Sequence, residues 1–408
     1  MPQTRIVSLF PALGNHHAKL ILPFVDEVIR SLDGSRDSTH VLMLYDKAED
    51  NWKNVFRDSL SADVAIEFVP KDIWALEQAL LRVPPDLLIV HSAFFPDLWR
   101  VFLLLPHLRE RTIWMIWGGD LGDFTNKITF VGVRTWLTQV LDRAICRRVF
   151  PRLGQIGALV PEDGRTLQRV YPKCQNVTRL VYPLMDDGIA EAPKSARIDA
   201  KPLRVLCGNS AFANNNHAEI IAWVEHLNRP GVEWIFPLSY GPRSVSEEIA
   251  ALGQARLGDN FRPLLELIPL AQYQQLLDGC DVLIFNHTQR NQQGLGNLYH
   301  LLPRGRKIFI RGDNTLTAEL KSWGCHIWDT LQLEQMTWER FSAPLTKAEA
   351  TANWAAYQKH ASRSVARQRW RDTLSKLLDR SAQRQPTEIT GSCTQLTRHL
   401  VSLMRRTT

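Results

Sequence analysis

Short apolar runs alternate with amphipathic stretches through most of this 408-residue chain, in two successive series. The runs have strand length, and the stretches between them have helical periodicity. This order predicts an α/β fold with a doubly wound parallel sheet in each half. The expected strands are 6–10, 41–45, 65–69, 87–90, 113–116 and 156–159 in the first series and 204–207, 233–237, 261–267, 282–285 and 307–310 in the second. The expected helices are 19–31, 73–82, 97–105, 216–227, 246–257, 270–277 and 298–302.

A polar segment without periodicity, 186–199, separates the two series and is interpreted as a linker. We therefore expect an N-terminal domain over 1–187 and a C-terminal domain over 200–345. A basic helical segment is expected over 346–384, and 385–408 is expected to be a flexible tail. Ligands of doubly wound sheets bind outside the carboxyl ends of the strands, so the two sheets are expected to face a cleft.

The formal net charge of +7 favours acidic partners. Charge alone does not distinguish nucleic acid, an anionic membrane and a phosphorylated ligand. The six cysteines lack zinc or redox spacing and are interpreted as small buried residues of a reduced, cytosolic protein. No apolar stretch reaches the roughly 18 residues that cross a bilayer, so any membrane association is expected to be peripheral.

Two glycine-containing turns follow strands of the second series. Glycine lets the backbone approach a ligand closely, and the N–H groups at a helix start favour an anion such as a diphosphate. An ordinary tight turn is the alternative. Asn215 could equally cap the helix at 216–227, and His217, near the start of that helix, could donate to a phosphate oxygen or be a capping or surface residue. The residues concerned are Gly208, Asn209, Ser210, Asn215 and His217 in one turn, and Gln292, Gln293, Gly294, Gly296 and Asn297 in the other.

A carboxylate in the first half is a candidate general base. Asp120 follows the strand 113–116 and could deprotonate an acceptor hydroxyl, although it could also cap the next helix. His91, at the end of the strand 87–90, competes for this role, as do His16 and His17 near the start of the chain.

Several strings together resemble the family of TDP-N-acetylfucosamine:lipid II N-acetylfucosaminyltransferases, which add the third sugar of the enterobacterial common antigen repeat. Order and spacing agree over roughly residues 5–330, and the Ile-Trp-Gly-x-Asp-Leu and Gln-Gln-Gly-x-Gly strings are fairly specific. The chain departs from the family at 303–306 and in 385–408. The matching strings are His16-His17, His91-Ser-Ala-Phe-Phe-Pro-Asp-Leu-Trp99, Trp114-Met-Ile-Trp-Gly-Gly-Asp-Leu121, Gly208-Asn-Ser210 with Asn215 and His217, Pro237 with Tyr240, and Gln292-Gln-Gly-Leu-Gly296.

The resemblance implies a GT-B glycosyltransferase with two Rossmann-like domains facing a cleft. It would move a 4-acetamido-4,6-dideoxyhexose from a TDP-sugar to a polyprenyl-diphosphate-linked oligosaccharide. The C-terminal domain would bind the donor through the two glycine turns. Tyr240 could stack on or border the thymine, and the alternative is a tyrosine packed in an ordinary turn. The N-terminal domain would bind the acceptor through His16, Trp117 and Gly118, and the catalytic candidates would be Asp120, His91 and His17.

The chain contains no Asp-x-Asp, the carboxylate pair with which metal-dependent sugar transferases usually hold their ion. We therefore expect no metal and no other cofactor. Helix N-termini together with Arg or Lys would neutralise the departing diphosphate.

A helix expected over 131–150 places Trp136, Leu137, Val140, Leu141, Ala144 and Ile145 on one face, with arginines elsewhere. It could attach to a membrane surface or pack on the sheet as an ordinary amphipathic helix, and both hold if the arginines stay exposed. With a lipid-linked acceptor, the resemblance implies a peripheral enzyme on the anionic cytoplasmic face of the inner membrane.

Three alternatives remain open at this point. A nucleotide-sugar epimerase could have the same two-domain fold, and a related transferase could use a different sugar. A nucleic-acid-binding protein could exploit the positive charge, but the sequence contains no basic stripe interleaved with aromatics and no recognition-helix motif. We therefore expect no nucleic-acid partner.

Overall fold

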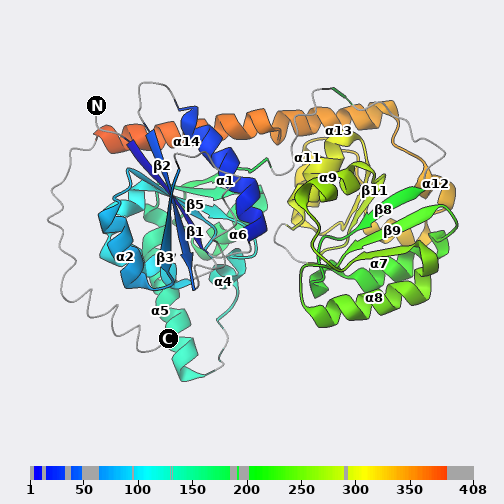
Figure 1. Ribbon diagram of the computed structural model, residues 1–408, viewed down its shortest axis with the longest axis horizontal. Coiled ribbons are helices and arrows are strands. Elements are labelled where there is room, and N and C mark those ends of the chain that lie inside the picture. Colours follow the sequence, from blue (N-terminus) through cyan, green and yellow to red (C-terminus); the bar gives the residue numbers. More distant parts are fainter. Residues whose placement is uncertain are drawn as a thin grey trace. The chain divides into compact units, whose positions relative to one another are not determined.

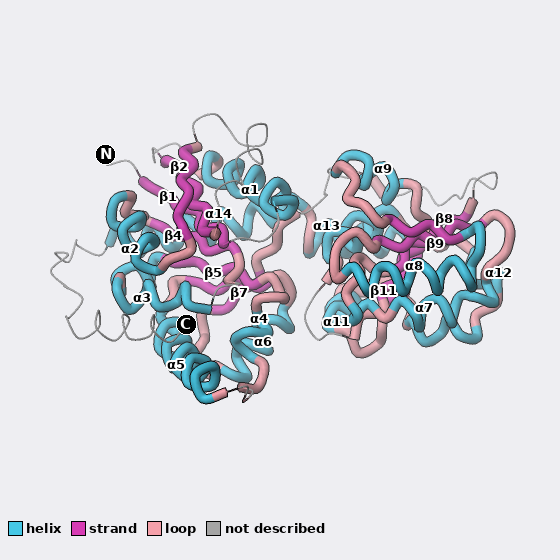
Figure 2. Tube along the Cα trace, turned by 60° about the horizontal axis from the view of Figure 1, so that its bottom comes forward, coloured by secondary structure: helices cyan, strands magenta, loops and turns pink. Residues whose placement is uncertain are grey.

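The computed structural model describes residues 4–11, 15–32, 38–47, 64–93, 96–128, 130, 132–183, 191–192, 202–288 and 293–383. The chain forms two compact units, the first from 1–182 with 366–408 and the second from 183–365. Each unit contains one parallel sheet covered by helices (Figures 1 and 2). The predicted α/β fold with two doubly wound sheets is confirmed.

The first unit contains a parallel sheet in the order β3-β2-β1-β4-β5-β6-β7. All strands predicted in the first half are present, but the sequence pattern did not indicate β7, because a three-residue strand with polar residues does not differ from a loop. The bounds are β1 Thr4–Pro11, β2 Ser38–Asp46, β3 Ala65–Pro70, β4 Leu87–His91, β5 Thr112–Ile116, β6 Gln155–Ala158 and β7 Val177–Arg179.

Side-chain alternation along the strands gives this sheet two apolar faces. Along β1, Val7 and Leu9 belong to the larger core, which also includes residues of α2, α3, α5 and α6. On the opposite face, Phe10 packs with Leu22 of α1. The helices of this unit are α1 Asn15–Arg30, α2 Ile73–Arg82, α3 Val101–Leu104, α4 Leu121–Thr125, α5 Val133–Val149, α6 Pro161–Val170 and α14 Arg363–Gln383, the last beginning in the second unit.

The second unit contains a parallel sheet in the order β10-β9-β8-β11-β12. Figure 1 shows α7 and α8 on one face and α9, α11 and α13 on the other. The strands are β8 Leu203–Cys207, β9 Val232–Pro237, β10 Phe261–Leu264, β11 Val282–Phe285 and β12 Lys307–Ile310. The helices are α7 His217–Val224, α8 Arg243–Leu257, α9 Leu270–Asp278, α10 Leu295–Leu301, α11 Thr315–Ser322, α12 Trp338–Ser342 and α13 Lys347–His360.

Two expected segments end or divide differently from the sequence pattern. β10 stops at Leu264, because Leu265 and Leu267 are 53% and 67% exposed and have no covering layer. The basic helical segment forms two helices, α13 in the second unit and α14 mostly in the first, where the Trp370 indole donates to the Val181 carbonyl at 3.1 Å. The tail 385–408 lies outside the described residues.

The strand orders define a topological switch point in each sheet, which is the place where successive strands begin to be added on the opposite side of the first strand. It lies between β1 and β4 in the first unit and between β8 and β11 in the second. Loops that leave the carboxyl ends of such strand pairs form the ligand crevice of open α/β sheets. The residues predicted to bind ligands follow these four strands or the neighbouring β5 and β9.

Candidate functional site

The loops after β8 and β11 are joined by a buried hydrogen-bond network, here called the β8–β11 edge. The Asn215 side chain is its centre: its Oδ1 accepts from the Asn209 N–H at 3.0 Å, and its Nδ2 donates to the Ser210 Oγ at 3.0 Å. Asn216, not Asn215, precedes α7, and no side chain caps that helix. The amide of Asn215 therefore fixes the shape of the loop Gly208–Ser210.

Two histidines at this edge have tautomers that their partners define. The His287 Nε2 lies 2.7 and 2.8 Å from the side-chain oxygens of Asn209 and Asn215, so it donates to them and the ring Nδ1 is unprotonated. The His217 Nε2 likewise donates to the Ser210 carbonyl at 2.7 Å. Burial lowers the pKa of His287 to about 3 and also lowers that of His217. Both rings are neutral at neutral pH.

Each of these rings has a buried Nδ1 without a hydrogen-bond partner among the described residues. An unprotonated imidazole nitrogen is an acceptor, so it complements a hydroxyl or an amide N–H and not a phosphate oxygen. Ligand groups of that kind occur on sugars. An anion at this edge would therefore have to bind backbone N–H groups, and the histidines would suit the neutral part of a ligand.

Gly208 is required by the geometry of the edge. Its φ is +72°, and a Cβ there would lie 2.4 Å from the His217 Cε1 and 2.8 Å from the Asn215 Oδ1. Only glycine occupies this conformation without strain and leaves room for the two side chains.

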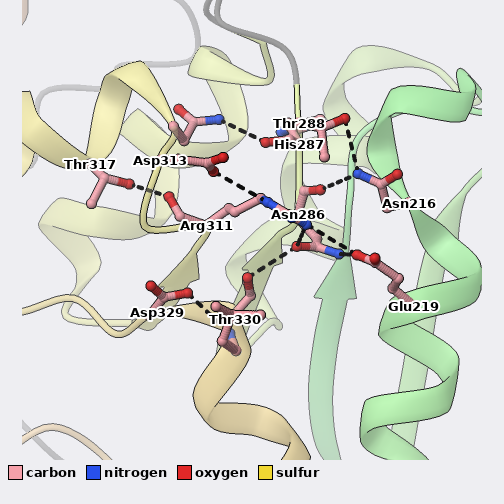
Figure 3. A network of polar contacts seen from close by, with 12 residues as sticks. Asn216, Glu219, Asn286, His287, Thr288, Arg311, Asp313, Thr317, Asp329 and Thr330 are labelled. Carbon is pink, nitrogen blue, oxygen red and sulfur yellow. Dashed lines mark hydrogen bonds and ion pairs between the residues drawn. The ribbon is translucent and has the colours of Figure 1, made fainter.

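The β11 loop is held from several elements around Asn286 (Figure 3). The Asn286 Nδ2 donates to Glu219 of α7 at 2.7 Å, and its Oδ1 accepts from the Thr330 hydroxyl at 3.0 Å. Arg311, just after β12, donates to Glu219 at 3.1 Å and pairs with Asp313 at 3.2 Å. Because two carboxylates already neutralise this arginine, the network supports the loop and does not present a free cation to a ligand.

The second glycine turn leads into α10. Gly294 precedes the helix at φ +65°, where a Cβ would lie 2.5 Å from the Phe285 ring. Gly296 is the second residue of α10, and Asn297, in its first turn, is 6% exposed. Gln293 is the first described residue of this turn, and Gln292 lies outside the described residues. The first-turn N–H groups have no acceptor within the helix, as at any helix start.

An exposed aromatic pair borders the β8–β11 edge. Tyr240 follows β9 and is 42% exposed, and Phe212 follows β8 and is 40% exposed. Their ring centroids lie 5.4 Å apart in an edge-to-face arrangement. The Ala211 N–H donates to the Tyr240 carbonyl at 2.6 Å, which joins the two loops. The pair offers exposed apolar surface beside the polar network.

In the first unit, the loops after β4 and β5 are tied together by Asp120, at what is here called the β4–β5 edge. Its two carboxylate oxygens accept from the backbone N–H groups of Ala93 and Trp117, each at 2.9 Å. Asp120 precedes α4 but makes no capping bond to it, and it is fully buried. Burial raises the pKa of Asp120 to about 7. A pKa near 7 suits a general base, but a fully buried carboxylate is not within reach of a substrate hydroxyl.

His91 also lies at the β4–β5 edge, in the interior. Its Nδ1 is 2.7 Å from the Tyr182 hydroxyl, and the Tyr182 ring stacks on Trp370 of α14 at 5.5 Å. Its Nε2 has no partner among the described residues. Burial lowers the pKa of His91 to about 3, so it is a neutral and weak base.

The other predicted acceptor residues lie at the same edge. Trp117 directly follows β5, with Phe10 5.5 Å away in an edge-to-face contact, and Gly118 has φ +81°. His16 and His17 lie in the first turn of α1, just after β1 at the switch point, but their side chains are outside what the structure describes. Among the described residues, no group of three or more His, Cys, Asp and Glu is arranged to hold a metal ion.

A family model described as 4-alpha-L-fucosyltransferase glycosyl transferase group 56 matches residues 4–343. The chain belongs to this family. The resemblance inferred from the sequence strings is thereby confirmed, and the protein is a glycosyltransferase.

Solved structures with the GT-B fold resemble this group 56 glycosyltransferase. Anabaena HepE in complex with UDP and glucose has a TM-score of 0.65 at 13% identity, over 92% of this chain and 100% of that one. The UDP-forming α,α-trehalose-phosphate synthase of Burkholderia xenovorans in complex with glucose-6-phosphate has a TM-score of 0.60 at 10% identity, over 92% of this chain and 100% of that one. The predicted GT-B fold is confirmed.

Sequence reasoning missed three residues that the fold brings to the β8–β11 edge. Arg311 directly follows the buried strand β12 of the transferase, and His287 is the second residue after the buried strand β11. That position was the available signal, since polar residues at strand carboxyl ends face the ligand crevice. Phe212 gave no such signal, because its partner Tyr240 is 28 residues away in the sequence.

Proposed function

We propose that this enzyme transfers a 4-acetamido-4,6-dideoxyhexose from a TDP-sugar to a polyprenyl-diphosphate-linked oligosaccharide. The observation that carries the donor half is the β8–β11 edge. Glycine-dependent backbone follows β8 there, and the turn into α10 follows the neighbouring strand β11. The His217 and His287 rings at this edge each have an unprotonated nitrogen without a partner among the described residues. Anabaena HepE, with the same fold, binds UDP-glucose.

The parts of the donor match the chemistry of this edge. The diphosphate would bind N–H groups of the loop at 208–210 and of the first turn of α10. The thymine would lie against the Tyr240–Phe212 pair, which is exposed and apolar. The hydroxyl and acetamido N–H of the sugar would meet the unprotonated histidine nitrogens. Departure of TDP would be favoured by these fixed dipoles, without a metal ion.

The acceptor half of the proposal assigns roles at the first switch point. His17, with His16 as the competing residue, would deprotonate the acceptor hydroxyl, because α1 begins where the loop after β1 ends. Asp120 would act as a positioning residue that holds the Trp117–Gly118 loop against the loop after β4. His91 would orient the same edge through Tyr182.

The donor assignment is tested by thermal shift with TDP, UDP and GDP. A ligand that binds the native state alone raises its apparent stability, and TDP should give the largest rise. Gly294→Ala should remove the rise, because its methyl group would meet Phe285. Gly258→Ala is the matched control, with φ +58° and no atom within 4 Å of the added Cβ. Equal shifts with every nucleotide, or none, would remove the donor assignment.

The reaction is tested by TDP release. Transfer requires that TDP release depend on added polyprenyl-diphosphate-linked acceptor, and transfer without a metal ion requires that this release continue in the presence of EDTA. Release or sugar inversion without acceptor would establish the epimerase alternative. Loss of turnover in His17→Ala with TDP binding retained would support His17 as the general base. Normal turnover in both His16→Ala and His17→Ala would exclude a histidine of α1 from this role.

A further inference from the structure

Large apolar side chains gather at the start of α5. Of the large hydrophobic residues that are exposed within the described parts of the chain, five lie between 130 and 141. Phe130 is 70% exposed and Val133 64%, and the remaining three are 40 to 46% exposed. We call these five residues the α5 tip: Phe130, Val133, Trp136, Leu137 and Leu141.

The second half of α5 differs from the first. Ile145, Cys146 and Val149 are buried in the core of the first unit and anchor the helix. The first half has no such anchor and projects beyond the sheet (Figure 1). The alternative that the whole helix packs on the sheet is therefore wrong for its first half. A solvated helix segment does not require four large apolar residues and a preceding phenylalanine.

Basic residues surround the α5 tip. Between 126 and 152 the sequence has six Lys and Arg residues and a single acid, Asp142. That acid is held by Arg100, whose Nε donates to it at 3.0 Å. Arg147 and Arg148 are exposed, about 10 Å along the helix from the last apolar residue of the tip. Apolar side chains followed at this spacing by cations complement an anionic lipid surface.

The position of the tip relates it to the β4–β5 edge. A helix that connects parallel strands begins at their carboxyl ends, and α5 lies between β5 and β6. Its start is therefore on the same side of the sheet as Asp120, from which only α4 and a short connection separate it in sequence. A lipid surface bound by the tip would lie on the side where the proposed acceptor site opens.

We propose that the α5 tip inserts into the headgroup region of an anionic bilayer, with Arg147 and Arg148 on lipid phosphates. The proposal extends the proposed function, because it names the surface by which the enzyme reaches a lipid-linked acceptor. Insertion of an interfacial segment to about 5–10 Å requires no spanning helix. Among the described helices, none has the length and apolar character to cross a bilayer.

The test is co-sedimentation with vesicles of phosphatidylethanolamine and phosphatidylglycerol. The double variant Phe130→Ser with Trp136→Ser should bind about thirtyfold more weakly, because two aromatic side chains no longer enter the bilayer. The double variant Arg147→Ser with Arg148→Ser should lose about fivefold per arginine on these vesicles. On vesicles of phosphatidylcholine alone, the arginine variant should match the wild type.

Controls separate the tip from apolar surface in general. Leu81→Ser and Leu331→Ser remove side chains that are 44% and 56% exposed elsewhere, and vesicle binding should be unchanged. Unaltered binding in the tip variant, or an equal loss in these controls, would overturn the proposal. A wild-type dimer in sedimentation that the tip variant abolishes would also overturn it, because the tip would then bind a second copy of the chain.

Activity distinguishes failure of this proposal from failure of the proposed function. With a short-chain acceptor in detergent, the tip variant should release TDP at the wild-type rate. With acceptor embedded in vesicles, its rate should fall in proportion to vesicle binding. If the wild type released no TDP with any acceptor, the proposed function would be contradicted. The vesicle-binding result would then still decide whether the α5 tip binds a bilayer.

Discussion

Replacement of Asp120 by asparagine should make this enzyme more stable at neutral pH and less active. The carboxylate is fully buried, and burial raises its pKa to about 7 from the ordinary value of 3.8. Between these values the native state binds the proton more tightly than the unfolded chain. The free energy of unfolding therefore falls as the pH rises from 3.8 to about 7. The protonated Asp120 contributes its full stabilisation only below pH 3.8.

The size of the effect follows from those two values. Ionisation of Asp120 in the native state lowers the free energy of unfolding by about 4 kcal/mol at pH values well above 7. Asparagine stays neutral and resembles the protonated acid, with one oxygen to accept from Ala93 or Trp117. The stability difference between Asp120→Asn and the wild type should therefore grow by about 3 kcal/mol between about pH 5 and about pH 8.

Thermal melts of both proteins at these two pH values measure the difference. At about pH 8 the variant should melt higher by on the order of 10 °C. TDP binding should be retained and turnover should fall, because asparagine cannot accept from both N–H groups and the two loops loosen. A gain in stability with a loss of activity is typical of a functional site that holds a strained group.

Asp72→Asn is the matched control. The Asp72 carboxylate also accepts two backbone N–H groups, those of Trp74 and Ala75, but at the start of α2. Asparagine caps helices as well as aspartate, so stability should change little at either pH. A difference for Asp120→Asn that does not vary with pH, or a variant less stable than the wild type at about pH 8, would refute the reasoning.

Two further predictions concern the β8–β11 edge. Gly208→Ala should abolish TDP binding in a thermal-shift assay, because its methyl group would lie 2.4 Å from the His217 ring at φ +72°. Gly231→Ala is the control: Gly231 has φ +86°, and no atom lies within 4 Å of the added Cβ. This variant should lose only about 1–2 kcal/mol of stability and still bind TDP. TDP binding by both variants would contradict the assignment of Gly208. His287 has a pKa of about 3 in the native state against 6.5 for the free side chain, so its contribution to stability is lost as the pH falls from 6.5 towards 3. His287→Gln should reduce the acid destabilisation measured by melts near pH 4, and identical acid sensitivity in variant and wild type would contradict this.

Local sequence was sufficient for most of the fold. Strands such as 282–285 are short apolar runs, and α2 was predicted with the bounds Ile73–Arg82, because helical periodicity is a local signal. β7 and the end of β10 were not predictable, because pairing with a neighbouring strand and the presence of a covering layer decide them, and neither is encoded locally.

The sequence by itself determined the family, the two series of strands and helices, and the glycine turns at Gly208 and Gly294. The tertiary structure alone decided what the polar residues do. It placed His287 against Asn215, 72 residues away, and so fixed which ring nitrogen accepts a hydrogen bond. It buried Asp120 between two loops, because a side chain's pKa and its access to a substrate depend on the packing around it and not on its neighbours in the chain.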